Sequence, residues 1–300
     1  MRVDPNYISN LAAALTQSTG QENTLTSELS SGLRVASLSD GPVAVAQSTL
    51  LGSSIAKDDT FVQTASNESS RMQVTDSTLG EVVTQITSAL STAVSGNNGT
   101  LNASDLASVA QKLSGIRDQV ISLANASYQG QYLFGGSQGS TPPFTLDTST
   151  TPATAIYNGD ANVQNVETPS GQKIQVNLPG SAVFGTAGSG VLGALNQLIS
   201  DFSSATPASA AITADTAGLT TALGQLSNQR ATLDSSLSRL QSSSTYIQTE
   251  QSELTVAQGN LVSADPASVA TQLSSAETQH QALLSVINAL GSGDLFSLMR

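Results

Sequence analysis

The sequence predicts a mainly α-helical protein with a small β-rich insert. Its long antiparallel helices, coiled-coil-like and formed by the N- and C-terminal arms, enclose a β lobe in the middle of the chain. Apolar residues recur every three or four positions across 219–261, and two shorter runs, 72–90 and 106–123, share this spacing. Residues 135–190 instead are rich in proline and glycine and contain alternating apolar positions, which favours short strands.

The first helix is expected near the N-terminus and the last near the C-terminus. Asp265 and Pro266 are typical of an N-cap and a first helical residue, and Gly291 is typical of a helix end. These helices are poor in large apolar residues, so we expect them to be disordered in the monomer and to form a coiled coil when another subunit covers them. The predicted assembly interface consists of Ile8, Leu11, Leu15, Leu25, Leu29, Leu33, Val269, Leu273, Leu283, Ile287 and Leu290.

The run at 219–261 predicts one long helix that packs inside the chain. The runs 72–90 and 106–123 predict an antiparallel helix pair, with Asn102 or Ser104 as the N-cap of the second helix. The expected contact positions within the chain are Leu223, Leu226, Leu233, Leu237 and Leu240. Arg230, Gln251 and Gln258 interrupt the apolar stripe, either as solvent-facing breaks or as polar residues that fix the register of the helices.

The β-rich insert contains one clear hairpin prediction. Residues 163–168 and 173–178 flank a Pro-Ser-Gly-Gln turn, and a helix that bears Leu195, Leu198, Ile199 and Phe202 follows the insert. We expect three regions: terminal helices at 1–41 and 262–300, a helical bundle at 42–134 and 191–261, and the β-rich insert at 135–190.

Composition excludes much of the enzyme repertoire. The 300 residues include no cysteine and one histidine, so disulfides, thiolate nucleophiles and multi-histidine metal sites are excluded. Ten basic and 22 acidic residues give a net charge of −12, the wrong sign for binding phosphate backbones. We therefore expect no cofactor, no metal site and no nucleic-acid partner.

Two short motifs resemble those of enzymes. Residues 135–139 match the nucleophile-elbow pattern around Ser137, with His280 downstream, but a serine hydrolase needs a strand-to-helix turn in a parallel sheet. Residues 188–193 match a dinucleotide-binding fingerprint without the βαβ unit that it requires. We interpret both as loops, expect no catalytic residue, and expect His280 to be a packed or interfacial side chain.

The sequence shows no pattern typical of a secretory signal or of a membrane-spanning segment. No apolar stretch near Met1 has the length of a secretory signal, and none approaches a membrane span, so we expect no membrane insertion. Taken literally this favours the cytosol, unless the chain is exported by a route that reads no cleaved signal.

Several blocks, in order along the chain, resemble a known family. The residues that carry the resemblance lie at 1–3, 29–35, 39–44, 130–136, 141–144, 157–160, 176–180 and 265–290. Together they are similar to the flagellar hook–filament junction protein family, also called hook-associated protein 3, of the flagellin-like superfamily.

The resemblance implies an extracellular structural adaptor of the bacterial flagellum, at the hook–filament junction. It implies a ring of copies between the first hook-associated protein and flagellin, export through the flagellar type III channel without a cleaved signal peptide, and a cytosolic export chaperone. Flagellin itself is the close alternative, and an intracellular coiled-coil scaffold is a more remote one.

Overall fold

The structure, a computed structural model, describes residues 5–99, 101–186, 188–204 and 208–291, and it confirms the predicted fold class. The chain divides into two compact units, one built from residues 1–56 and 250–300, the other from residues 57–249. Helices α2 (Pro42–Gly96) and α6 (Ser209–Val262) each contribute to both units. In the described part of the chain no helix is long and apolar enough to cross a membrane.

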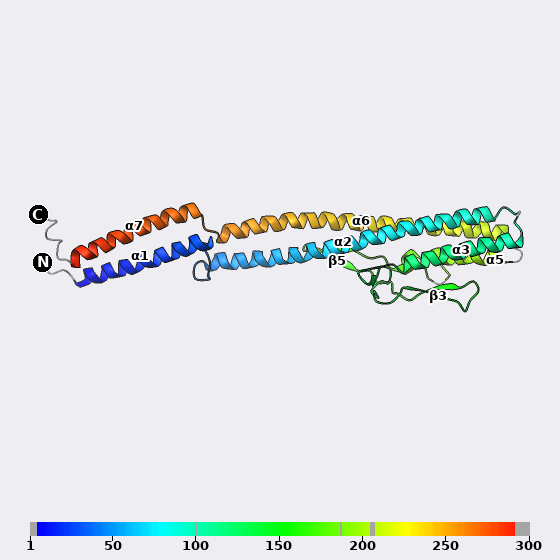
Figure 1. Cartoon of the computed structure of the whole chain (residues 1–300), viewed down its shortest axis with the longest axis horizontal. Helices are drawn as coiled ribbons and strands as arrows, with labels where there is room; N and C mark the ends of the chain where they lie inside the picture. The colour runs from blue at the N-terminus through cyan, green and yellow to red at the C-terminus, as the bar shows by residue number, and fades with distance from the viewer. Residues whose placement is uncertain (1–4, 100, 187, 205–207, 292–300) are drawn as a thin grey trace. The chain divides into compact units, whose positions relative to one another are not determined.

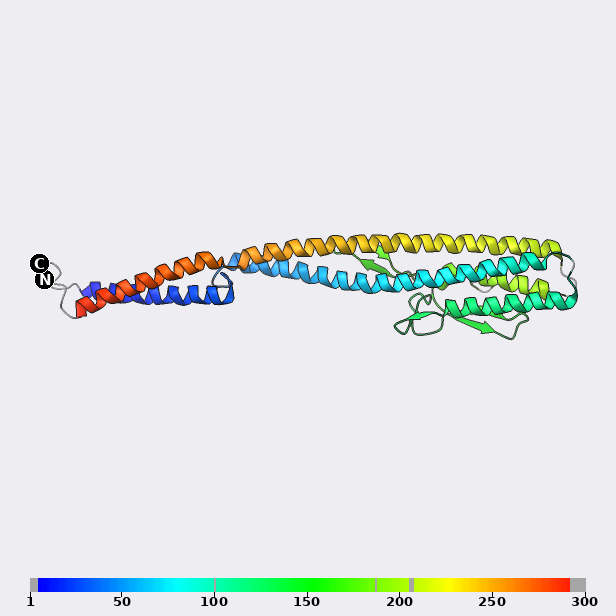
Figure 2. The ribbon, with the colours of Figure 1, turned by 45° about the horizontal axis from the view of Figure 1, so that its top comes forward.

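The first unit contains the terminal helices α1 (Pro5–Ser31) and α7 (Pro266–Gly291). They lie side by side and run in opposite directions (Figures 1 and 2). The Asp265 carboxylate accepts a hydrogen bond from the Ala267 amide at 3.1 Å, which confirms the predicted N-cap. Helix α1 ends at Ser31, and the φ of +70° at the following Gly32 is typical of a glycine just after a helix C-terminus.

The second unit contains a bundle of four helical segments. These are residues 57–96 of α2, α3 (Ala103–Ala124), α5 (Gly190–Ser203) and residues 209–249 of α6. The Asn102 side chain accepts hydrogen bonds from the amides of Ser104 and Asp105, at 2.9 and 3.0 Å, so Asn102 is the N-cap of α3. The helix predicted to bear Leu195, Leu198, Ile199 and Phe202 is α5, and these side chains are buried in the core.

The core of the bundle follows a seven-residue repeat on two helices. In α2 the repeat is Met72, Leu79 and Ile86, all with no exposed surface. In α6 the fully or almost fully buried positions are Leu219, Leu226, Leu233, Leu240 and Ile247, while Leu223 and Leu237 are half-buried beside them. Each fully buried leucine, isoleucine or methionine contributes about 1.5–3 kcal/mol. Because the repeat continues without a slip, α6 remains one helix.

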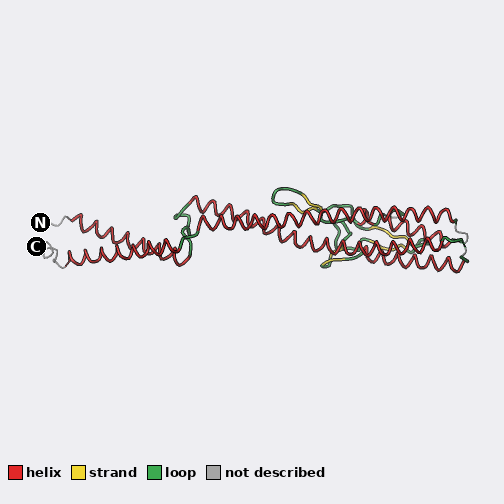
Figure 3. The backbone as a smooth tube through the Cα atoms, turned by 90° about the horizontal axis from the view of Figure 1, so that it is seen from above, coloured by secondary structure: helices red, strands yellow, loops and turns green. Residues whose placement is uncertain are grey.

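Three two-stranded antiparallel hairpins form the β lobe (Figure 3). They pair β1 (Ser127–Tyr128) with β2 (Gln131–Tyr132), β3 (Phe144–Asp147) with β4 (Thr154–Tyr157), and β5 (Asn165–Glu167) with β6 (Lys173–Gln175). The third is the predicted hairpin, with shorter strands than expected. The first two have strands of two and four residues, too short for alternation to reveal them.

An aromatic cluster holds the lobe together. The ring of Phe144 lies 5.0 Å from that of Tyr157 and 5.4 Å from that of Phe184, which in turn meets Phe134 edge-to-face at 5.0 Å. The short helix α4 (Gly180–Val183) begins here, and a Cβ on Gly180 would lie 2.8 Å from the rings of Phe144 and Tyr157. The lobe contacts the bundle through β3 against α3 and β4 against α5.

Many serine and threonine hydroxyls on the helices donate to the carbonyl oxygen four residues earlier in the same helix. Exposed examples are Thr16, Thr19, Thr24, Thr64, Thr84, Thr92, Thr220, Thr232, Thr245, Thr255, Thr271 and Thr278. These hydroxyls are satisfied within their own helix.

Candidate assembly surface

The contact between α1 and α7 is narrow. Its buried apolar side chains are Leu25, Val269 and Ala276, with Leu273 and Ala264 packed against them. Of the other predicted interface residues, Leu11, Leu15, Leu283 and Ile287 are half-buried, and the side chains of Ile8 and Leu290 lie outside the described part. Such a small apolar contact leaves little surplus over the entropy of ordering two helices.

Two predicted interface residues face solvent. Leu29 is 41% exposed and Leu33 is 38% exposed, although both share the spacing of Leu25. The predicted set therefore divides in two, with Leu25, Val269 and Leu273 in the α1–α7 contact and Leu29 and Leu33 outside it.

Further apolar side chains of the first unit are exposed, and the sequence analysis did not single them out. They are Leu38, Val43, Leu50, Val256, Leu284 and Val286, of which Val43 and Leu50 are each 70% exposed. Val43 and Leu50 are seven residues apart on α2, a spacing that could have revealed them. These six residues together with Leu29 and Leu33 are called the terminal apolar surface below, and they are distributed over α1, the connection that follows it, α2, α6 and α7. These exposed apolar side chains are the strongest candidates for contact with another protein.

A polar contact interrupts the α1–α7 pair. The Nδ1 atom of His280 lies 3.7 Å from Oε1 of Glu22, and neither atom has a hydrogen-bond partner among the described residues. Ser18, on the same helix as Glu22, is also buried, and its hydroxyl oxygen has no hydrogen-bond partner within the described part of the chain. His280 is thus an interhelical side chain, as its heptad position predicted.

Backbone pairing joins the end of α1 to the start of α7. Leu33 and Ser263 form an isolated antiparallel bridge, and the amide of Ala264 donates to the carbonyl of Gly32 at 2.9 Å. The Arg34 guanidinium donates to the Leu261 carbonyl at 3.0 Å. Further along the connection, hydrogen bonds from Ser37 lower the pKa of the Asp40 carboxyl. The connection from 32 to 41 is therefore a bonded element that fixes where α1 ends and where α7 begins.

The motif around Ser137 lies in a loop after β2, not at a strand-to-helix elbow. The Ser137 hydroxyl donates to the Asp160 carboxylate, which also accepts from the Ser137 and Asn162 amides at 2.8 and 3.0 Å. These hydrogen bonds, chiefly those from Ser137, lower the pKa of Asp160 to about 2. The Ser137 hydroxyl is bonded to Asp160 within a turn, and Ser137 does not lie at the strand-to-helix elbow that a serine nucleophile of this pattern needs.

The glycine-rich segment 188–193, predicted to be a loop, comprises the end of the loop before α5 and the first turn of that helix. A Cβ on Gly190 would lie 2.7 Å from the Phe184 carbonyl oxygen and from Gly185 Cα, and the φ of Gly190 is +66°. The glycine is required by this close backbone approach. No strand of a βαβ unit precedes it among the described residues.

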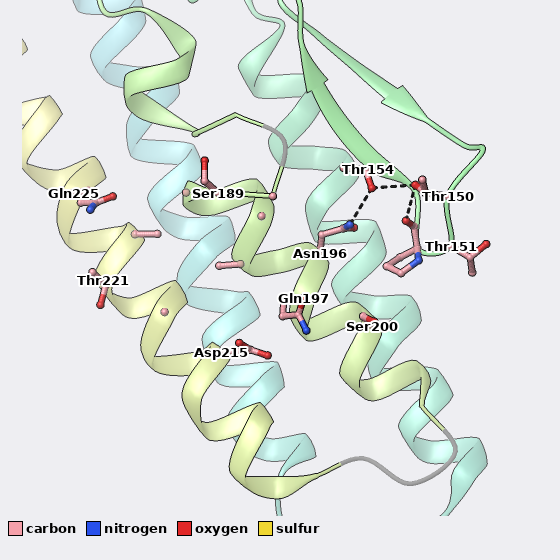
Figure 4. A pocket seen from close by; sticks show the side chains of 17 residues that line it. Thr150, Thr151, Thr154, Ser189, Asn196, Gln197, Ser200, Asp215, Thr221 and Gln225 are labelled. Atoms are coloured by element: carbon pink, nitrogen blue, oxygen red, sulfur yellow. Dashed lines mark hydrogen bonds between the residues drawn. The ribbon is translucent and has the colours of Figure 1, made fainter.

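A polar hollow of about 680 Å³ lies between α5, α6 and the β3–β4 loop (Figure 4). The hydroxyls of Thr150 and Thr154 are 3.0 Å apart, and the Asn196 side chain reaches Thr154 at 3.4 Å. Among the described residues that line it, only Asp215 is titratable. Partial burial and the neighbouring Asp201 raise the pKa of Asp215 to about 6. Asp215 with Asp201 beside it, among hydroxyls and amides, provides neither a nucleophile–base pair nor a full set of metal ligands.

Comparisons with known proteins match both ends of the chain. Residues 6–139 match the bacterial flagellin N-terminal helical region, and residues 216–295 match the flagellin C-terminal helical region. The chain is 30% identical over 179 residues to flagellar hook-associated protein 3 of Salmonella typhimurium, covering 59% of this chain and 54% of that protein. It is 34% identical over 118 residues to the Escherichia coli protein of the same name, covering 39% of this chain and 37% of that one.

The aligned part thus spans about half the length of these relatives or less. A solved structure of flagellar hook-associated protein 3 from Legionella pneumophila has a TM-score of 0.62 at 14% identity, covering 71% of this chain and 98% of that one. This similarity shows a shared fold. The matches to the two flagellin regions and to the two named relatives agree with the family resemblance that the sequence motifs indicated. The chain therefore belongs to the flagellin-like family, and within it the chain is similar to hook-associated protein 3.

Proposed function

We propose that this chain is the structural adaptor of the flagellar hook–filament junction, outside the cell and without enzymatic activity. The observation that carries the proposal is the pairing of the two family-matched ends, α1 and α7, through a contact whose buried apolar side chains, among the described residues, are Leu25, Val269 and Ala276. A pair so thinly packed, with a surrounding terminal apolar surface, is suited to completing its core against other chains.

The partners in this proposal are copies of the same chain in a ring, the first hook-associated protein on one side and flagellin on the other. A cytosolic chaperone would protect the terminal helices before export. The names of the relatives support the junction, because both are hook-associated protein 3 and neither is flagellin.

Gene deletion and complementation test the function. Cells that lack the gene should keep their hooks but lose attached filaments, and the wild-type gene should restore attachment. Motile cells with attached filaments after deletion would overturn the proposal. If the chain instead dominates sheared filaments by mass, it is flagellin, because a junction protein is present only as a trace.

Substitutions on the terminal apolar surface test where assembly occurs. Leu29 and Leu284 are each 41% exposed, so Leu29→Asp and Leu284→Asp should leave monomer unfolding almost unchanged but abolish filament attachment. Val163→Asp, in the β lobe at 47% exposure, is the matched control and should retain attachment. Normal attachment in both leucine variants would show that this surface is not the assembly surface.

The terminal helices are further proposed to order fully only on assembly. Limited proteolysis of the isolated chain should trim 1–41 and 262–300 faster than the bundle. Equal protection of both ends and the bundle would favour the coiled-coil scaffold alternative.

A further inference from the structure

Three polar atoms in the contact between α1 and α7 are buried without a hydrogen-bond partner among the described residues. They are Oγ of Ser18 and Oε1 of Glu22, one turn apart on α1, and Nδ1 of His280 on α7. Nδ1 lies 3.7 Å from Oε1, which is longer than a hydrogen bond. Because an unpaired polar atom is costly to bury, a change that lets these atoms bond would stabilise the contact.

Glu22 is the carboxylate that faces His280 from the opposite helix. Glu28 lies six residues further along α1 and lines a hollow beside Arg34, close to the connection that follows the helix. Glu277 lies three residues before His280 on α7 itself and is exposed. These three glutamates and His280 are the acidic and basic residues within the bounds of α1 and α7, so His280 is the only base that the two helices can share.

The imidazole ring of His280 can exchange protons with solvent, although its contacting atom is buried. The side chains of His280 and Glu22 are 23% and 22% exposed. Neutral imidazole has one N–H group, whereas the protonated ring has a hydrogen on both nitrogens, so Nδ1 then faces the Glu22 carboxylate as a charged donor. Imidazole side chains change charge between about pH 5 and 8. Acidification across this range therefore converts two unpaired buried atoms into a charge-assisted pair.

We infer that Glu22 and His280 form a proton-dependent clasp, which holds α1 against α7 in mildly acidic solution and weakens as the pH rises. Protonation of His280 adds attraction only when the helices are paired, so this part of the pairing free energy is present at low pH and lost at high pH. The remaining apolar contact is small, because its buried side chains among the described residues are Leu25, Val269 and Ala276. The clasp lies within one chain, and it acts whether or not the chain functions at the junction.

Distances between spin labels on the two helices test the clasp in the full-length chain. The sequence has no cysteine, so Gln17→Cys on α1 and Ser274→Cys on α7 place one label on each helix. Both positions are exposed, and neither lies within four residues of Glu22 or His280. Pulsed electron resonance gives the ratio of paired to separated helices. From pH 8 to pH 5.5 this ratio should rise about two- to fivefold, the range expected for a partly exposed ion pair.

Substitutions that remove one charge separate the clasp from other effects of pH. Glu22→Gln and His280→Gln keep a polar side chain of similar size, and each should abolish the rise in the ratio. Glu28→Gln on the same helix as Glu22 is the matched control, and Glu277→Gln tests the neighbour of His280 on its own helix. Both should retain the rise. The exchanged pair, Glu22→His with His280→Glu, should recover it.

A ratio that stays constant between pH 8 and pH 5.5 would overturn the inference, as would an equal rise in Glu22→Gln or the loss of the rise in Glu277→Gln. Asp215, whose pKa is about 6, titrates in the same range, but it belongs to the second unit and is common to all the variants. Circular dichroism of each variant checks that the bundle remains folded, so that a lost response is not caused by unfolding.

Discussion

The guanidinium of Arg230 on α6 and the carboxylate of Asp76 on α2 form a two-point ion pair inside the apolar stripe of the bundle. Nε lies 2.8 Å from Oδ1 and Nη2 lies 3.0 Å from Oδ2, and the carboxylate raises the pKa of Arg230. This geometry favours the register-setting interpretation of Arg230, because a slip of one helix along the other would separate both pairs of atoms. Gln258 likewise donates to the Ser48 carbonyl, at 2.9 Å.

Replacing Arg230 by methionine should destabilise the second unit by about 0.5–1 kcal/mol, since both side chains remain about one-third exposed and solvent screens the pair. Chemical denaturation of Arg230→Met, Asp76→Asn and the double variant measures the coupling between them. Arg239→Met, exposed on the same helix, is the control. A coupling of zero would show that the pair does not hold the two helices together.

Arg117→Met should lower the free energy of unfolding by about 2–3 kcal/mol, more than the Arg230 variant does. Arg117 is 5% exposed, and its Nη1 donates to the Ala153 carbonyl at 2.8 Å and to Asn196 Oδ1 at 3.2 Å. Methionine would fill the space but leave both acceptors unpaired. Thermal unfolding measures the loss, and Lys112→Met, exposed on the same helix, should change stability by less than about 0.5 kcal/mol. Equal effects of the two variants would contradict this role.

Leu226→Ala should cost about 2–5 kcal/mol, because Leu226 has no exposed surface and its removal leaves a cavity. Leu223→Ala should cost clearly less, since Leu223 is half-buried at the edge of the same stripe. Both values come from denaturant unfolding. A larger loss at Leu223 would mean that the stripe does not face the core as described.

The stability of the second unit should decrease as pH rises from about 4 to 6. The folded-state pKa of Asp215, raised by burial and Asp201, is about 6 and its ordinary value is 3.8, so across this range the folded state holds a proton that the unfolded state has lost. Asp215→Asn should therefore stabilise the protein at pH 7.5 by about 1 kcal/mol, after allowance for solvent screening. The difference should vanish below pH 4, and a constant difference across pH would contradict the assignment.

Asp160 should act in the opposite direction. Its pKa of about 2 in the folded state lies below the ordinary 3.8, so its stabilising effect is complete above pH 4 and is lost as pH falls toward 2. Asp160→Asn should lower the unfolding temperature by a few degrees at pH 7 and have little effect near pH 2. Melting curves at both pH values provide the test, and Asp147→Asn, in another turn of the lobe, is a comparison variant.

The helices could be predicted from the sequence because their information is local and repeated. A seven-residue spacing predicts both a helix and its buried side, as at Leu219, Leu226, Leu233 and Leu240. The same rule could not separate buried Leu25 from exposed Leu29, because the spacing indicates a face but not how far a partner covers it. The aromatic cluster could not be predicted from the sequence either, because Phe134 and Phe184 are fifty residues apart and come into contact only in the folded lobe.

The hydroxyls that donate to their own helix change what the polar composition means. The Thr245 hydroxyl, for example, donates its hydrogen bond to the carbonyl oxygen one turn earlier. It therefore has no donor left for another molecule, and the threonine also presents its methyl group. Large parts of the helix surfaces are therefore hydrophilic by residue count but have few free hydrogen-bond donors. A neighbouring molecule could cover them and strip away water without having to supply an acceptor for every hydroxyl it hides.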